Sequence, residues 1–251
     1  MNIDWVRQAL PGRRIDYHET LDSTMLAAAR LASEGCRAGT AVVAGRQTAG
    51  QGRHGHSWYS PPGAGLYVSI VLRPQVPFDW LPVLTLATGL AAVEAIARST
   101  NLRCDLRWPN DLMLDAKKVG GILLQLQERG VIAGIGINVS QDAFPAELAA
   151  EATSLLLAAG REPSREDLLI RVLQTTDAFT RMLEEAGRQA ILDLFTRTSS
   201  YAQGKDVTVQ QGDDVIHGVT AGLDESGFLK VRRAGGDEIT VLAGGVRAAR
   251  A

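Results

Sequence analysis

The chain has 251 residues, 45% of them hydrophobic, which is enough to bury the core of one large domain or of a medium domain with a small companion. Its 26 Lys and Arg and 28 Asp and Glu give a formal net charge of −2, which excludes the basic footprint of a general nucleic-acid binder. Two distant cysteines without metal or redox spacing, no apolar run of about 20 residues and no charged-then-apolar leader predict a cytoplasmic protein with neither nucleic acid nor a membrane as partner.

Helices and strands are mixed in the first half of the chain. Asp22-Ser23-Thr24 supplies N-cap side chains in front of an apolar helical stripe, and Pro82 suits the first turn of a second helix. Alternating apolar residues from Leu102 to Trp108 indicate a half-buried strand. The predicted elements are a helix from Ser23, strands over 40–44 and 66–72 around a glycine-rich stretch at 45–65, a helix from Pro82 to about Asn101, and a strand over 102–108.

The second half passes from a hairpin to helices. Glu128-Arg129-Gly130 is a short glycine-containing connection between apolar runs at 122–126 and 131–137, which predicts an antiparallel hairpin. Apolar residues at helical spacing then predict two core helices. The first of them begins at the cap residue Ser164 and reaches about Leu183, and the second runs through Ile191, Leu194 and Phe195.

Short strands separated by glycine-containing turns follow from about Gly204. The expected strands contain Val207 and Val209, residues 215–219, residues 228–231 and residues 239–242. They predict a small all-β unit. At about 45 residues it is near the size at which a domain struggles to fold alone, so we expect it to pack on the larger unit.

The loop Gln47–Trp58 joins two strands and contains three glycines, one arginine and two histidines. Glycines let backbone N–H groups approach an anion, and the guanidinium of Arg53 offers a planar fork of donors, so the loop predicts phosphate binding. The alternative is a flexible surface connection with a solvated Arg53. His54 and His56 lack further ligands nearby and do not predict a metal site. Trp58 suits either core packing or an adenine platform.

Two further segments place polar residues at the ends of strands. In Arg107-Trp-Pro-Asn110-Asp111, Asp111 could bind Mg²⁺ carried by a nucleotide and Asn110 could orient a phosphate or ribose; a plain Asn-Asp turn is the alternative. Lys118 precedes the pair Gly120-Gly121 at the entrance to an apolar strand. It could point inward as a charge clamp, or it could be a surface lysine beside a bulge.

Taken together, these segments resemble the biotin protein ligase family, of the type without an N-terminal DNA-binding domain, in both order and spacing. The segments that carry the resemblance are Asp22-Ser23-Thr24-Met25, Gln47–Trp58, Arg107–Asp111, Lys118–Leu123 and Gly134–Val139. The resemblance implies an α/β (α+β) fold, with a mixed β-sheet and helices in a class II synthetase-like catalytic domain over residues 1–203. It also implies a small SH3-like C-terminal β-barrel over residues 204–251.

The same resemblance implies a reaction. The carboxylate of biotin attacks the α-phosphorus of ATP, with Mg²⁺, to give biotinyl-5′-AMP, and a lysine of a biotin carboxyl carrier domain then attacks this anhydride. The implied catalytic residues are Lys118, Arg53 and Asp111, with Asp111 also holding Mg²⁺. Biotin would contact Ser23, Thr24, Gln47, Gly50, Gln51, Gly52, Arg53, Lys118 and Gly120, and ATP would contact Arg53, Trp58, Asn110, Asp111, Lys118 and Asn138. The exposed face of the sheet could serve a homodimer or acceptor docking.

This sequence departs from the family pattern at four positions. Met25 replaces an asparagine, Gln51 and His56 replace arginines, and Arg107 replaces a lysine, so the loop is less cationic than usual.

Three alternative functions are less consistent with the sequence. A lipoate ligase or a lipoyl or octanoyl transferase shares the architecture, but the Gly-Gln-Gly-Arg-His-Gly loop and the Trp-Pro-Asn-Asp turn favour biotin.

A biotin-responsive repressor needs a helix-turn-helix with its supporting core, and only about 15 residues precede the expected catalytic domain. A biotin-binding protein without catalysis would not need Lys118, Arg53 and Asp111 together.

Overall fold

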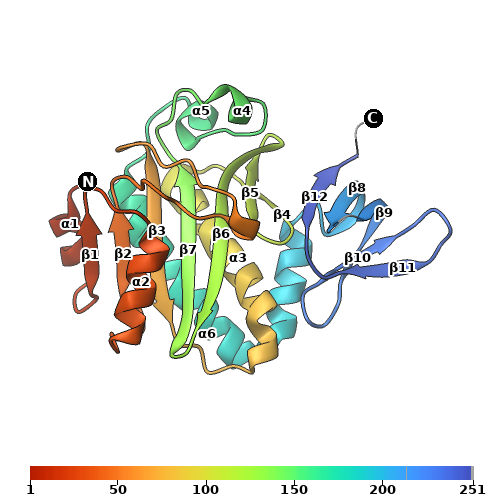
Figure 1. Ribbon diagram of the computed structural model, residues 1–251, viewed down its shortest axis with the longest axis horizontal. Coiled ribbons are helices and arrows are strands. Elements are labelled where there is room, and N and C mark those ends of the chain that lie inside the picture. The colour runs from red at the N-terminus through yellow and green to blue at the C-terminus, as the bar shows by residue number, and fades with distance from the viewer. Residues whose placement is uncertain (213, 250–251) are drawn as a thin grey trace.

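A seven-stranded mixed sheet forms the centre of the larger unit in the computed structural model, which describes residues 1–212 and 214–249 (Figure 1). Its strand order is β1-β2-β3-β7-β6-β5-β4; β1 runs parallel to β2 and the other neighbours are antiparallel. The predicted mixed sheet is therefore confirmed. The strands are β1 (Ile15–His18), β2 (Ala41–Ala44), β3 (Gly65–Leu72), β4 (Asp105–Arg107), β5 (Asp111–Leu114), β6 (Lys117–Gln127) and β7 (Gly130–Asn138).

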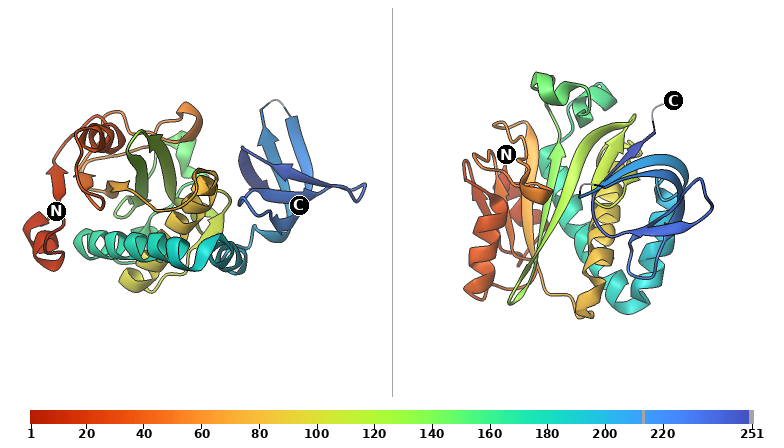
Figure 2. Two further views of the ribbon diagram at one scale, coloured as in Figure 1. Left: turned by 90° about the horizontal axis from the view of Figure 1, so that it is seen from below. Right: turned by 45° about the vertical axis from the view of Figure 1, so that its right-hand side comes forward.

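Helices cover both faces of this sheet (Figures 1 and 2). On one face α2 (Thr24–Ser33) buries Met25, Ala28 and Leu31 against side chains of β2, β3 and β7. On the other face α3 (Leu81–Thr100) and the long α6 (Arg165–Thr198) pack against each other and form the main core with the sheet. The remaining helices are α1 (Ile3–Ala9), which contacts α6, the short α4 (Ala146–Ala149) and α5 (Leu155–Ala159), and the single turns η1 (Arg53–Gly55) and η2 (Phe78–Trp80).

The helix ends follow the predicted signals. Ser164 Oγ accepts a hydrogen bond from the Asp167 N–H, and Pro82 lies in the first turn of α3. Asn101 ends α3 in the left-handed conformation, with φ 64°, and donates its N–H to Ala97 O. Gly187, with φ 77°, breaks α6 between the two predicted helices. Ser23 occupies the N-cap position of α2, but its hydroxyl makes no capping bond.

One helical segment of the described residues, Phe78–Thr100, is long and apolar enough to span a membrane by length and composition, which the sequence analysis did not expect. Its most apolar window is 61% buried, and it packs against α6 and the sheet. We therefore assign this segment as the core helix of the larger unit, since a core helix passes the same test.

One prediction for the larger unit was wrong in detail. The strand expected over 102–108 is limited to Asp105–Arg107, because the left-handed Asn101 starts a connecting segment and Trp108 begins a turn. The N-terminal elements also pack on the larger unit, because β1 pairs with β2 and α1 contacts α6.

A second, five-stranded antiparallel sheet follows α6 at one side of the larger unit (Figure 2). Its order is β11-β10-β9-β8-β12, with β8 (Gln203–Gln211), β9 (Asp214–Leu223), β10 (Leu229–Arg232), β11 (Glu238–Val241) and β12 (Gly245–Ala248). This is the antiparallel sheet expected of an SH3-like unit. Within the described residues β11 and β12 do not pair, so hydrogen bonds do not close a barrel. The fifth strand, β12, was not predicted.

The two units meet at a buried hydrogen bond. Trp108 Nε1 of the larger unit donates to Gly227 O of the smaller one at 2.9 Å. Gly227 has φ 84°, and a Cβ there would lie 3.1–3.6 Å from side chains of α3 and α6. This close approach fits the expectation that the small unit packs on the large one.

Candidate active site

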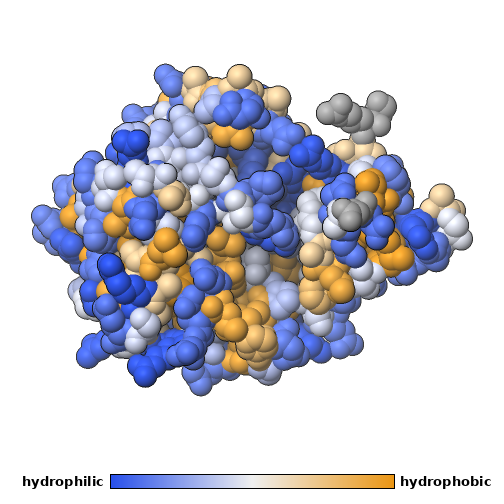
Figure 3. All heavy atoms as spheres, viewed as in Figure 1, coloured by the Kyte–Doolittle hydropathy of each residue, from blue (hydrophilic) through white to orange (hydrophobic). Residues whose placement is uncertain are grey.

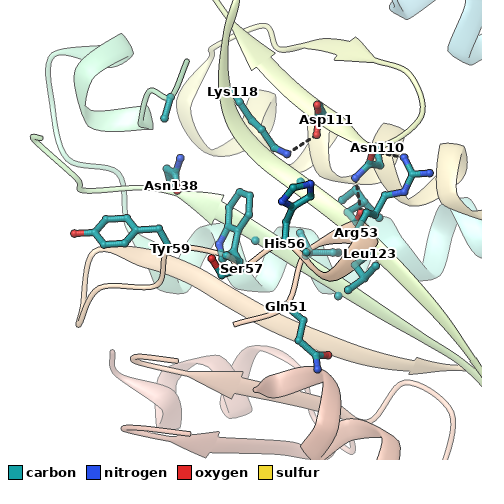
Figure 4. Close-up of a pocket in the computed structure, with 18 of the residues that line it drawn as sticks. Gln51, Arg53, His56, Ser57, Tyr59, Asn110, Asp111, Lys118, Leu123 and Asn138 are labelled. Atoms are coloured by element: carbon teal, nitrogen blue, oxygen red, sulfur yellow. Dashed lines mark hydrogen bonds and ion pairs between the residues drawn. The ribbon is translucent and has the colours of Figure 1, made fainter. Parts of the chain in front are cut away.

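A cavity of about 470 Å³ lies beneath the loop Gln47–Trp58, over β6 and β7 (Figure 4). Gly244, Gly245 and Arg247 of the smaller unit also line it. In the space-filling view a hollow is visible between the two units (Figure 3). The predicted site residues that line the cavity are Thr24, Gln47, Gln51, Gly52, Arg53, Trp58, Asn110, Asp111, Lys118 and Asn138.

The other three predicted residues, Ser23, Gly50 and Gly120, lie behind the cavity wall. Ser23 is fully buried, and its hydroxyl has no hydrogen-bond partner. A Cβ on Gly50 would lie 2.7 Å from Trp58 O, and one on Gly120 would lie 2.8 Å from Gly136 O. These glycines are needed where two segments of backbone pass close together.

The loop is a small closed turn that Arg53 joins to the sheet. Gly52 N–H donates to His56 O at 2.7 Å and Trp58 N–H donates to Gly50 O at 2.9 Å, which fixes the ends of the turn. Arg53 Nη1 donates to Asn110 Oδ1 at 3.0 Å (Figure 4). Burial lowers the pKa of Arg53 while the charge of Asp111 raises it, and an arginine remains a cation throughout. Gln51 points away from Lys118 (Figure 4).

Asp111 lies between two cations on neighbouring strands. Arg107 Nε and Nη2 donate to its Oδ2 at 3.1 and 2.7 Å, and Lys118 Nζ lies 2.5 Å from its Oδ1. Lys118 points inward, as one of the two sequence readings expected, although a register shift between β5 and β6 also lies beside it. Lys117 is exposed.

With Arg53, a cluster of three cations lies near the carboxylate of Asp111 in the wall of the cavity. The excess of positive charge in this cluster suits a polyanion such as a nucleoside triphosphate.

The residues present do not form a resident metal site. In the part of the chain that the structure describes, no group of three or more His, Cys, Asp or Glu residues could hold a metal ion. Asp111 is a single carboxylate, and both of its oxygens already accept bonds from cations. Mg²⁺ fits this cavity as an ion carried by the phosphates of a nucleotide.

Trp58 packs on the sheet and also lines the cavity. Its ring covers Gly121 and Gly136: a Cβ on Gly136 would lie 2.6 Å from Trp58 Cε2. The indole Nε1 is buried without a partner, and Lys118 Nζ lies 5.4 Å from the ring centroid. Trp58 therefore presents a flat aromatic surface beside the cation cluster.

A polar network near α2 reaches the cavity through Thr24 and Gln47, while its other members, Ser60 and Ser69, are buried. Gln47 Oε1 accepts from Thr24 N–H at 2.8 Å and from Thr24 Oγ1 at 3.0 Å. Ser69 Oγ donates to Thr24 Oγ1 at 2.8 Å, and Gln47 Nε2 donates to Ser60 Oγ at 3.0 Å. The sequence analysis missed Ser60 and Ser69. Ser69 could have been found, because it is a serine inside an otherwise apolar strand whose residues are all buried.

Two more residues define the walls. Met25 is 3% exposed, lines the cavity beside Thr24, and packs so closely on β7 that a Cβ on Gly134 would lie 2.5 Å from its Sδ. Asn138 Nδ2 donates to Thr153 O at 2.9 Å, and its Oδ1 accepts from Gln141 Nε2 at 3.2 Å. Asn138 thus fastens the segment after β7 as well as lining the cavity.

The smaller unit contributes to the edge of the cavity. Arg247 of β12 lies 3.5 Å from Glu151, which belongs to the segment between α4 and α5. Both side chains are exposed, and both residues line the cavity. Sequence reasoning missed Arg247 because β12 itself was not predicted.

Two protein-family models match this chain. Residues 17–142 match the Biotin/lipoate A/B protein ligase family, and residues 203–246 match the Biotin protein ligase C terminal domain. Among curated proteins, the bifunctional ligase/repressor BirA of Bacillus subtilis is 37% identical over 87% of this chain and 69% of its own length. The biotin–[acetyl-CoA-carboxylase] ligase of Mycobacterium tuberculosis is 32% identical over 87% of this chain and 82% of its own length.

Solved structures give the same grouping. A biotin protein ligase from Aquifex aeolicus in complex with biotin and ATP superposes with a TM-score of 0.83 at 32% identity, covering 95% of this chain and 99% of that one. A biotin protein ligase from Leishmania major in complex with biotinyl-5-AMP has a TM-score of 0.65 at 26% identity, covering 92% of this chain and 99% of that one.

Proposed function

This chain belongs to the biotin protein ligase family, and on that premise we propose that it uses ATP to attach biotin to a lysine of an acceptor protein through biotinyl-5′-AMP. One observation carries the proposal: a single cavity joins Thr24 and Gln47 of the polar network to the cluster of Arg53, Arg107 and Lys118. A small polar molecule and a polyanion can therefore meet in one enclosed space.

We place the ring system of biotin at the polar network. Its ureido group has two N–H donors and one carbonyl acceptor, and hydroxyl and amide groups can satisfy both kinds. Thr24 and Gln47 would make these contacts, with Ser23, Gly50, Gln51, Gly52 and Gly120 shaping the surrounding wall. The valeryl chain would then lead the carboxylate toward Lys118.

We assign the cation cluster to the first chemical step. A carboxylate oxygen of biotin forms a bond to the α-phosphorus of ATP, the bond between the α- and β-phosphates breaks, and pyrophosphate leaves with its Mg²⁺. Lys118 and Arg53 would neutralise the charge that gathers on these oxygens, which is the main requirement for phosphoryl-type transfer. Asp111 would orient Lys118, Asn110 would hold Arg53, and Trp58 and Asn138 would flank the adenosine.

In the second step the neutral amine of the acceptor lysine attacks the acyl carbon of biotinyl-5′-AMP. An amide bond forms, the bond from the acyl carbon to the phosphate oxygen breaks, AMP leaves, and the proton that the amine loses passes to AMP or water. We propose that the acceptor is a biotin carboxyl carrier domain of a carboxylase. The printed name of the M. tuberculosis relative, an acetyl-CoA-carboxylase ligase, supports this choice.

The acceptor needs a surface next to the cavity, and β6 offers one. Residues 123–127 of β6 pair with β7, whereas hydrogen bonds on the other side of β6 end at Ile122, whose N–H donates to Asn110 O and whose C=O accepts from Asn110 Nδ2. Within the described residues, the other edge of 123–127 therefore carries free backbone groups. Apolar residues gather around this strand (Figure 3), and Leu126 is 48% exposed. We propose this edge for acceptor docking, with a homodimer as the other use. We also propose a cytoplasmic location and a boundary between the two units at residues 203 and 204.

Biotin-dependent exchange of pyrophosphate into ATP tests the first step. The Lys118→Ala variant should lose at least about 100-fold of this exchange, because it removes the charge that bridges the two reactants. Lys117→Ala is the matched control: it removes an exposed lysine of the same strand and should exchange at the wild-type rate. Near-normal exchange by a natively folded Lys118→Ala protein would overturn the assigned site, and no exchange by the wild type would overturn the proposed function.

A further inference from the structure

The function proposed above counts Arg107 in the cation cluster but gives it no contact of its own to a reactant, yet Arg107 makes a two-pronged contact to Asp111. It is the last residue of β4, directly opposite Asp111 in the β4–β5 pairing. Both of its donating nitrogens reach the same oxygen, Oδ2, at 3.1 and 2.7 Å. The other oxygen, Oδ1, is thereby left for Lys118 Nζ at 2.5 Å.

The path of the Lys118 side chain explains how Lys118 reaches the pair of Arg107 and Asp111. Asp111 lies opposite Gly121 in the β5–β6 pairing, and Lys118 lies three residues before Gly121 on β6. A Cβ on Gly121 would lie 3.3 Å from Lys118 Cε and 3.5 Å from its Nζ. The lysine side chain therefore runs over this glycine to reach Asp111. All three side chains are less than one-third exposed: Arg107 19%, Asp111 15% and Lys118 32%.

Two cations that share one carboxylate compete for it. The carboxylate attracts each of them, and they repel each other, more strongly here than in water because the side chains are largely buried. Arg107 thus weakens the hold of Asp111 on Lys118 without removing it. Lys118 must leave Asp111 to bind the carboxylate of biotin and the α-phosphate of ATP. The ion pair between Asp111 and Lys118 therefore has to be strong enough to position Lys118 and weak enough to release it.

We propose that Arg107 is a positioning residue for adenylate formation, which sets how readily Asp111 releases Lys118 to the reacting oxygens. The proposal rests on the function proposed above. Arginine suits the task because its planar fork saturates one oxygen of Asp111, and the position of this oxygen is fixed by the strand pairing. Arg107 touches neither reactant in this account; it acts through Asp111.

The experiment measures kcat and KM of biotin-dependent ATP–pyrophosphate exchange in the full-length protein for the variants Arg107→Gln, Arg107→Lys, Asp111→Asn and the double variant Arg107→Gln/Asp111→Asn. Arg107→Gln should lower kcat about tenfold, in the range of couplings between members of one ion-pair network, with KM for biotin and ATP within about twofold. Arg107→Lys keeps the charge and should recover most of the lost rate. The double variant should have the same kcat as Asp111→Asn, because without the charge of Asp111 there is no carboxylate for which Arg107 and Lys118 compete.

Three results would overturn the proposal. Wild-type kcat in Arg107→Gln would show that Arg107 does not influence Lys118. A raised KM for ATP that persists in the Asp111→Asn background would make Arg107 a direct phosphate contact. A loss of the same size with and without Asp111, accompanied by a lower unfolding temperature, would make it a tether of β4. Because each comparison is made against an active wild type, these results are distinct from failure of the proposed function.

Discussion

Replacing Arg53 by glycine should let biotinyl-5′-AMP escape from the site before transfer. Arg53 is the one arginine of the loop 47–58, and its bond from Nη1 to Asn110 Oδ1, at 3.0 Å, ties the loop to the turn before β5. If the guanidinium also binds the phosphate of the adenylate, its removal loses a hydrogen bond to a charged group, worth roughly 1.5–3 kcal/mol. That corresponds to about a ten- to hundredfold weaker hold on the intermediate. A glycine at position 53, close to Gly52 and Gly55, would also give the loop additional freedom to open.

The assay counts biotin on a bystander protein that is separated from the enzyme, biotin and Mg·ATP by a dialysis membrane. Arg53→Gly should label the bystander at least tenfold more than the wild type does. His54→Gly is the matched control, because it adds a glycine to the same loop at a residue that already has φ 54° and an exposed ring. Equal labelling by wild type and Arg53→Gly, with adenylate synthesis retained in both, would refute the reasoning. Strong labelling by His54→Gly would show that loop flexibility, and not the lost guanidinium, releases the intermediate.

Two further predictions concern stability. Trp108→Phe removes the indole N–H that donates to Gly227 O and leaves a buried carbonyl unpaired, so the unfolding free energy should fall by about 1–3 kcal/mol in a urea titration. An unchanged midpoint would show that this bond does not hold the two units together. Met25→Asn restores the residue common in the family but places an amide where a thioether packs on Gly134, and stability should fall by about 1–3 kcal/mol. A variant as stable as the wild type would mean that the amide finds partners at this wall.

The sequence predicted those parts of the site whose chemistry is unusual for their surroundings. Lys118 in front of two glycines, Asp111 after a proline turn and Arg53 in a glycine-rich loop are each conspicuous in the chain, and the structure brings all three to one cavity. Ser164, Pro82 and the glycine connection at 128–130 mark helix and hairpin ends by local backbone physics. Such signals need no knowledge of distant residues.

The parts that were missed depend on which segments become neighbours. The bond between Arg107 and Asp111 exists because β4 and β5 pair in one register, and a shift by one residue would place the two side chains on opposite faces. Ser69 matters because its strand lies beneath Thr24 of α2. Arg247 is on a four-residue strand that forms by pairing with β8, and four residues carry too little periodicity to be recognised alone.

The position of the cavity follows from where the sheet can tolerate glycine. Gly121 and Gly136 are direct partners across β6 and β7, and Gly134 lies two residues before Gly136 on β7. Side chains are therefore missing from a patch of sheet that Trp58 and Met25 cover. Glycine weakens a strand because it gives up more backbone freedom on folding and packs no side chain. Here β7 is hydrogen-bonded along its whole length, to β3 on one side and to β6 on the other. The backbone pairing offsets the loss, and a central strand can therefore leave room for a ligand that an edge strand with the same glycines could not hold in place.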